Sequence, residues 1–265
     1  DTPFVEARPW NSDLLITENS TISLEKRFEE KKYRKDVLYS QPPAELFQAP
    51  MILISQGFGK IAYSDFNVLF QDSLQSIAGP EEDKSLLMFL TVYLRSKLAR
   101  YFLFHTSANW GTERDKVPLN ELLRVPFPLP GHEFISPDSE NILKQVVRKF
   151  DQLGIQLQNK FNEMQSQATC YSLLESKDSD FNQRWPQERK HRVDEFQDEI
   201  EPLIYQYFGL TEQEIILVED AFRIFEPSST PTTRYSSKTT TLDPLMETSV
   251  EPYSTNGLSV YADTL

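Results

Sequence analysis

The spacing of apolar residues divides the chain into two halves. In the first half, short apolar runs alternate with turn residues, and residues 49–55 form an apolar run typical of a buried strand. Two more strand-like runs follow at residues 61–64 and 67–71. Helical spacing is present in residues 21–40, where we expect a short helix, and again in residues 84–104. We therefore predict mixed α and β structure for the first half.

The second half of the chain has a purely helical pattern. After a proline-rich segment at residues 126–131, apolar residues recur at steps of three and four over residues 143–171. This near-heptad spacing favours an antiparallel partner helix, which we predict within residues 191–208. Gly209 is expected to end that helix, and residues 211–214 read Thr-Glu-Gln-Glu, a capping box that predicts another short helix.

These patterns predict an α+β fold in three parts. Residues 1–133 would form a mixed-sheet domain with helices, and residues 134–220 a long antiparallel helical spacer. Residues 221–265, which are acidic and rich in Ser, Thr and Pro, would form an extended, partly disordered tail. The chain begins with Asp1 and stops at Leu265 within a polar stretch, so we expect it to be a piece of a longer protein.

The charge of the chain is unevenly distributed. The net charge of −13 argues against nucleic-acid binding, because phosphate contacts need Lys and Arg. However, residues 194–265 hold 14 acidic and 3 basic side chains, against 26 and 24 in residues 1–193. Residues 23–35 and 91–124 are locally basic, with six Lys or Arg against three acidic side chains each. The acidity is therefore mainly a property of the C-terminal part, although an isolated basic stretch of this kind is more often simply a solvated face.

Several classes of protein are disfavoured by what the sequence lacks. A single cysteine, Cys170, excludes an internal disulfide framework, and no stretch approaches the roughly 20 apolar residues of a membrane helix. We expect a cytoplasmic protein without membrane association. The three histidines have no metal-ligand spacing, and no Gly-x-Ser-x-Gly motif supports a hydrolase. We predict no catalytic residue, no metal and no cofactor within this chain.

The segment from residue 91 to residue 130 carries the most suggestive chemistry. A basic helix there runs into an apolar stretch and then into a polar loop at residues 107–116. Asn109 and Arg114 offer donors for base edges, and the loop also supplies cations for phosphate. Trp110 adds a planar ring, although this residue is equally compatible with a place in a core.

This segment resembles the C-terminal target-recognition region of adenine-N6 DNA methyltransferases, including fused restriction–modification enzymes. It is more distantly similar to the specificity subunits of type I restriction systems. Residues 46–57 resemble the strand-and-glycine opening of that region, and residues 70–79 the strand and turn before its first long helix. The long helical spacer and residues 204–211 follow in the same order, so the resemblance covers about residues 45–220.

The resemblance implies a domain that closes over double-stranded DNA and reads base edges while a catalytic domain flips the target adenine. The S-adenosylmethionine loop and the Asn/Asp-Pro-Pro-aromatic motif of the family are absent from this chain. We therefore expect S-adenosylmethionine and the catalytic methyltransferase domain in the rest of the parent protein or in a partner subunit. The expected DNA contacts are Asn109, Trp110, Thr112, Arg114 and Lys116, with Lys97, Arg100 and Lys60 at phosphates.

Two further expectations follow. The acidic tail should oppose DNA binding, so removing residues 221–265 is predicted to raise the affinity for duplex DNA at low salt. The alternative function is a protein-interaction or scaffold module that docks a partner subunit through its helical pair. That alternative predicts a stable complex without DNA.

Overall fold

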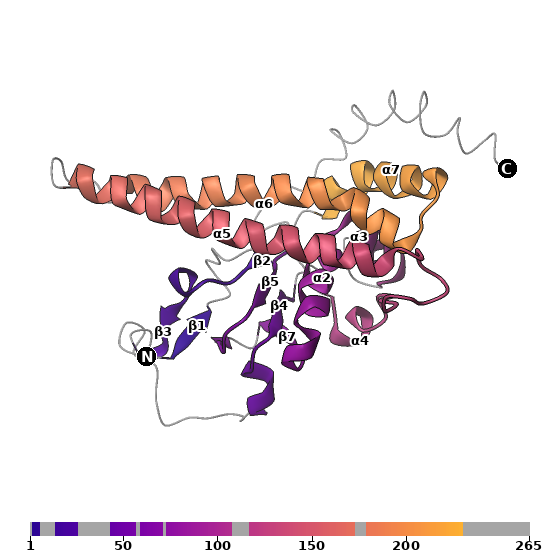
Figure 1. The fold of residues 1–265 in the computed structure, drawn as a ribbon, viewed down its shortest axis with the longest axis horizontal. Helices are drawn as coiled ribbons and strands as arrows, with labels where there is room; N and C mark the ends of the chain where they lie inside the picture. The colour runs from indigo at the N-terminus through magenta and orange to yellow at the C-terminus, as the bar shows by residue number, and fades with distance from the viewer. Residues whose placement is uncertain are drawn as a thin grey trace.

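The computed structural model describes residues 2–5, 14–25, 43–56, 59–70, 73–107, 117–172 and 179–229. It is an α+β fold in which two small mixed sheets lie beneath a long antiparallel pair of helices (Figure 1). The mixed α and β character predicted from the sequence is confirmed. We refer to the two sheets together as the sheet unit. Short 3-10 turns lie between or directly after its strands: η1 (Glu18–Ser20), η2 (Ala44–Phe47) and η3 (Glu81–Asp83).

The larger sheet has four strands, and its two central strands are buried on both faces. Its order is β2 (Leu14–Leu15), β5 (Ile61–Ser64), β4 (Met51–Ser55) and β7 (Leu74–Ala78). Strand β4 is antiparallel to both of its neighbours, whereas β2 is parallel to β5. Alternate side chains of β4 enter two different cores, with Ile52 and Ile54 facing the helices and Met51 and Leu53 facing a smaller cluster. Burial on both faces explains why this strand is apolar without interruption.

The smaller sheet has the order β3 (Ile22–Ser23), β1 (Pro3–Val5) and β6 (Leu69–Phe70). Ile22 lies opposite Phe4 in an antiparallel pair, so the helix predicted over residues 21–40 is wrong at its beginning. Ile22 and Leu24 have the two-residue spacing of one strand face, and pairing with β1 decides the conformation of Ile22. Residues 26–42 lie outside the described part of the chain.

The helical pattern over residues 84–104 forms two helices rather than one. They are α2 (Lys84–Arg95) and α3 (Lys97–Thr106), and they are separated by Ser96, whose φ of −66° and ψ of 159° are extended. The Ser96 hydroxyl accepts a hydrogen bond from the Ala99 backbone N–H at 3.2 Å and so caps α3. The helical prediction is therefore confirmed, but its continuity is wrong.

The two long helices are α5 (Ser139–Ser172) and α6 (Ser179–Phe208), preceded by the short α4 (Leu119–Leu122). Helix α6 begins earlier than predicted and contains two prolines. Gly209, with a φ of +66°, ends it as predicted.

The capping box that follows is also present, because the Glu214 carboxylate accepts the Thr211 backbone N–H at 2.8 Å. This box opens α7 (Glu212–Ser229), so residues 221–229, where the extended tail was expected to begin, are helical instead.

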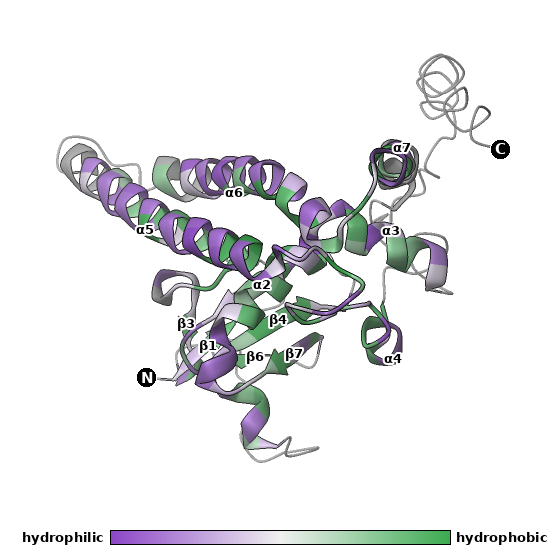
Figure 2. Cartoon of the chain, turned by 45° about the vertical axis from the view of Figure 1, so that its right-hand side comes forward, coloured by the Kyte–Doolittle hydropathy of each residue, from purple (hydrophilic) through white to green (hydrophobic). Residues whose placement is uncertain are grey.

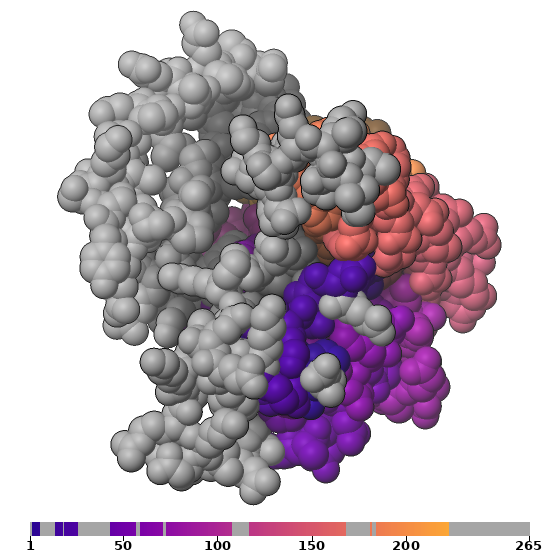
Figure 3. Space-filling model, turned by 90° about the vertical axis from the view of Figure 1, so that its left-hand side faces the viewer, coloured from indigo at the N-terminus to yellow at the C-terminus, as the bar shows by residue number. Residues whose placement is uncertain are grey.

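One hydrophobic core joins the sheet unit to the helical pair. The ring of Phe150 on α5 lies between Tyr63 of β5 and Phe196 of α6, with centroid distances of 5.9 and 6.1 Å and edge-on geometry. Both long helices contribute apolar residues to this core, and apolar and polar residues alternate along them (Figure 2). In the space-filling view the helices lie directly against the sheet unit (Figure 3). Within the described ranges, no helix combines the length and apolar character needed to cross a membrane.

Candidate functional site

The polar loop predicted to contact DNA begins and ends at residues that the structure describes. Ser107 terminates α3 by donating its backbone N–H to the Leu103 carbonyl oxygen at 2.8 Å, and its hydroxyl donates to the Glu121 carboxylate of α4. At the other end, the Val117 backbone N–H donates to the Gln56 carbonyl oxygen at 2.8 Å. We refer to Ser107, Glu121, Val117 and Gln56 as the loop base. Both ends of the loop are thus held by contacts from other elements.

One predicted phosphate contact, Lys60, lies next to the loop base. The turn between β4 and β5 is closed by two hydrogen bonds, from the Ser55 backbone N–H to the Lys60 carbonyl oxygen at 2.9 Å and from the Lys60 backbone N–H to the Ser55 hydroxyl at 3.0 Å. Gln56 belongs to the same turn and also donates its backbone N–H to Ser73 at 3.2 Å. Lys60 is therefore at the end of the four-stranded sheet that Val117 contacts through Gln56.

The other predicted loop contacts cannot be placed in the same way. Residues 108–116 lie outside the described part of the chain, so the expected roles of five residues remain predictions. These residues are Asn109, Trp110, Thr112, Arg114 and Lys116.

The structure does not bring Lys97 and Arg100 to the loop base. Both residues lie in the first turn of α3, whereas the loop leaves from its last residue. A helix of 10 residues is about 15 Å long, so these two cations are separated from Ser107 by most of that length.

Helix α7 covers both of these cations. The Lys97 ammonium lies 2.7 Å from a carboxylate oxygen of Glu219, and its side chain is 28% exposed. The ring of Phe222 also faces them, with its centroid 5.7 Å from Lys97 Nζ and 5.9 Å from Arg100 Cζ. At these distances the two contacts are modest cation–π interactions, and their attraction adds to that of the ion pair.

Two further polar groups complete this junction between α3, α6 and α7. The buried Glu201 carboxylate accepts the Lys97 backbone N–H at 2.8 Å, and the Tyr205 hydroxyl donates to Glu219 at 2.8 Å. Burial raises the pKa of Glu201, and the hydrogen bond from the Lys97 backbone opposes that rise. Burial also raises the pKa of Tyr205 above its ordinary range, so its hydroxyl stays protonated and donates. Glu219 is therefore held by two helices at once.

Other basic side chains point inward and stabilise the fold. Arg95 donates to the Ile61 carbonyl oxygen at 3.3 Å and to the Gln197 side chain at 3.4 Å, which joins α2, β5 and α6. Arg189 of α6 donates to the Leu15 carbonyl oxygen. Arg95 belongs to the locally basic stretch at residues 91–124, so part of that positive charge is used inside the fold.

The role of α7 was not predicted from the sequence. Ile215, Val218 and Phe222 have the spacing of one helical face, and this signal indicates an amphipathic helix. It does not indicate which surface that face contacts, and the contact with Lys97 and Arg100 is a tertiary feature. Within the described ranges, no group of three or more His, Cys, Asp or Glu side chains is placed to hold a metal ion.

Comparison with known proteins adds no family to these observations, because no protein-family model, no curated protein and no solved structure matches the chain.

Proposed function

We propose that this chain is the DNA target-recognition part of a restriction–modification DNA methyltransferase. The observation that carries this proposal is the loop base, which holds both ends of a polar loop next to Lys60. Reading base edges requires donors whose position is fixed by a rigid frame, because a misplaced donor loses its discrimination between bases. In this proposal Asn109 and Arg114 read base edges and Lys60 contacts a phosphate.

The helical pair would set the distance between recognition and catalysis. Helix α5 has 34 residues, which corresponds to about 50 Å, and α6 runs back along it. The shared core through Phe150 supports a fixed orientation of the pair relative to the sheet unit. The catalytic domain and S-adenosylmethionine would belong to the rest of the parent protein or to a partner subunit.

A selection from randomised duplex DNA tests this proposal without knowledge of the target sequence. The chain should enrich one sequence motif, and Arg114→Ala should relax one position of it, at a cost of about 1–3 kcal/mol. Lys60→Gln should weaken binding to all sequences alike and reduce the slope of log K against log salt by about 0.9. Lys190→Gln, on the outer face of α6, is the matched control and should leave motif and slope unchanged. Absence of any enriched motif, together with salt-independent retention of duplex, would exclude the proposal.

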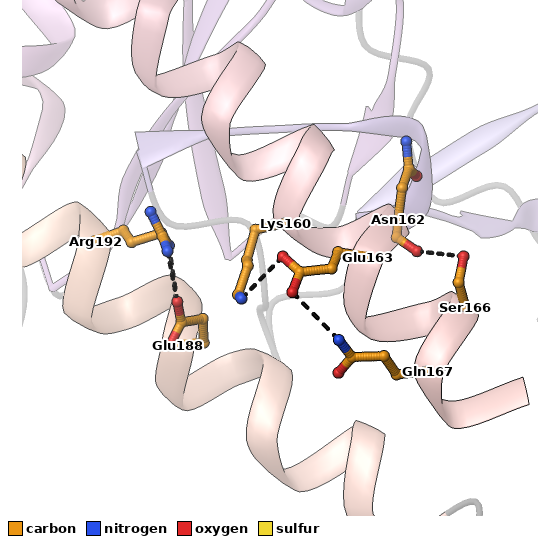
Figure 4. A network of polar contacts seen from close by, with 7 residues as sticks. All are labelled: Lys160, Asn162, Glu163, Ser166, Gln167, Glu188 and Arg192. Atoms are coloured by element: carbon orange, nitrogen blue, oxygen red, sulfur yellow. Dashed lines mark hydrogen bonds and ion pairs between the residues drawn. The ribbon is translucent and has the colours of Figure 1, made fainter. Parts of the chain in front are cut away.

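A second candidate function is the docking of a partner protein. Where the two long helices face each other in Figure 4, the polar side chains drawn are bonded within their own helix and so are already satisfied. Lys160 contacts Glu163 at 3.0 Å, and Arg192 contacts Glu188 at 2.8 Å. The side chains that favour docking are apolar and exposed, and they lie on α4 or in the segment between α4 and α5: Leu119, Leu123, Leu129 and Phe134.

Light scattering with the rest of the parent protein distinguishes the two functions. Docking through this segment predicts a complex without DNA that Leu123→Ser and Phe134→Ser abolish. DNA recognition predicts that these two substitutions leave the selected motif unchanged.

A further inference from the structure

Helix α7 and helix α3 have opposite charge. Helix α3 contains two basic residues and no acidic one, whereas α7 contains five acidic residues and one basic residue. Helix α7 packs mainly on α3, and Figure 2 shows it end-on above that helix. Its contacts there include the Glu219 carboxylate on Lys97 and the Phe222 ring over Lys97 and Arg100.

We infer that α7 occupies a phosphate-binding face of α3, with the Glu219 carboxylate in the place of a DNA phosphate, and that duplex DNA and α7 compete for Lys97 and Arg100. This inference rests on the proposed function and deepens it, because it names a regulated part of the DNA-binding surface. Carboxylate and phosphate are both anions that an ammonium group binds through the same N–H donors.

The competition follows from the position of a single group. The Lys97 Nζ that contacts Glu219 at 2.7 Å would have to turn away from it to reach a phosphate. Glu219 would then lose its cation while it still acts electrostatically on the buried Glu201 carboxylate, and the like charges would disfavour the docked helix. DNA binding and α7 docking therefore oppose each other, and linkage makes that opposition reciprocal.

The construction of α7 permits its release as an intact helix. Its capping box, formed by Thr211 and Glu214, satisfies its first turn without help from α3. Gly209, in a left-handed conformation, separates it from α6. The ion pair between Lys97 and Glu219 is partly exposed, with 28% and 29% of the side chains accessible, so its contribution is modest and the contact is reversible.

The test combines two measurements on the full chain. Hydrogen exchange of α7 amides reports docking, and fluorescence anisotropy of a labelled duplex over a salt series reports DNA binding. Glu219→Gln removes the charge but keeps an acceptor for Tyr205. Glu212→Gln makes the same charge change at the exposed first residue of α7 and serves as the matched control.

Glu219→Gln should speed the exchange of α7 amides and tighten DNA binding at low salt. The slope of log K against log salt should become steeper by at most about 1.8, the value for two additional cations at phosphates, and by less where DNA already displaces part of α7 in the unmodified chain. Glu212→Gln should change neither exchange nor slope to this extent. Saturating DNA should also speed α7 exchange in the unmodified chain.

Each contrary result has a separate meaning. If α7 exchanges faster in Glu219→Gln while DNA affinity and slope stay unchanged, the inference is wrong and the proposed function stands. If Glu219→Gln leaves α7 protected, the double variant Glu219→Gln/Phe222→Ala decides, and continued protection with unchanged DNA binding also overturns the inference. If no variant binds duplex DNA, the proposed function itself fails and the inference fails with it.

Discussion

Arg189 of α6 donates a hydrogen bond from Nη2 to the backbone carbonyl oxygen of Leu15 at 2.5 Å, across 174 positions of sequence. The Arg189 residue is only 4% exposed, and the neighbouring Leu14 is fully buried with a φ of +69°. A leucine in this left-handed region is strained, so surrounding contacts must hold it there. Strand β2 is thus fixed between β5 on one side and α6 on the other.

Replacing Arg189 tests this attachment. Arg189→Met keeps an apolar stem but leaves the Leu15 carbonyl without this donor, so we expect a loss of about 1–3 kcal/mol in the free energy of unfolding. Urea denaturation measures the change. Lys190→Met, at the next position on the exposed face of α6, should change stability by less than about 1 kcal/mol. Equal effects of the two substitutions would show that the Leu15 contact contributes nothing.

Glu201 should make stability depend on pH. Because burial raises its native pKa above the ordinary value of 4.5, the native state binds this proton more tightly than the unfolded chain does. The contribution of Glu201 is therefore most favourable below pH 4.5 and is lost as the pH rises through the raised native pKa. Glu201→Gln keeps an acceptor for the Lys97 N–H and cannot ionise.

We expect the difference in unfolding free energy between Glu201→Gln and the unmodified chain to shift in favour of the variant as the pH rises above 4.5. Denaturation at a series of pH values measures it. Glu199→Gln, whose side chain is 58% exposed on the same helix, should show a much flatter difference. A difference for Glu201→Gln that is constant with pH would contradict the prediction.

Tyr207 should attach the proline-rich segment to α6. Its hydroxyl donates to the Pro128 carbonyl oxygen at 2.7 Å, and burial raises its pKa to about 12, so the donor proton is retained at neutral pH. Tyr207→Phe should cost about 0.5–1.5 kcal/mol, the usual value of one such bond. Tyr207→Ala also removes the ring that lies 4.4 Å from Phe89 and should cost about 3–5 kcal/mol. Thermal denaturation of both variants separates the bond from the packing.

The sheet unit and the helical pair should unfold together. Phe150→Ala removes the ring between Tyr63 and Phe196 and should cost about 3–5 kcal/mol. Hydrogen exchange should show the same loss of protection in β4 and in α5, because one core serves both. Gln156→Ala, on the exposed face of α5, is the control. Loss of protection in only one of the two elements would show that they are separate folding units.

The sequence pattern predicted correctly those elements whose conformation follows from the spacing of residues within them or directly beside them. The apolar run of β4 reads as a strand because both faces are buried, and the near-heptad spacing of α5 reads as half of a helical pair. Gly209 and the capping box at Thr211 also act through adjacent residues, so they could be recognised.

Features that depend on distant residues could not be predicted. Ile22 pairs with β1, and the break at Ser96 is stabilised by the Glu201 carboxylate from α6 as well as by its own hydroxyl. The candidate site likewise combines a feature set by nearby residues with one that depends on a distant residue. Lys60 lies near the loop base as the proposal needs, whereas the contact of Lys97 with α7 depends on Glu219, far away in the sequence.

The loop base has a consequence for how such a protein could change. Ser107 and Val117 are held by Glu121 and Gln56, all of which lie outside residues 108–116. The hydrogen bonds of the loop base therefore do not depend on the side chains of those nine positions. Substitutions there leave the four residues of the loop base and the hydrogen bonds between them in place, so the two ends of the segment can be kept while the sequence between them changes.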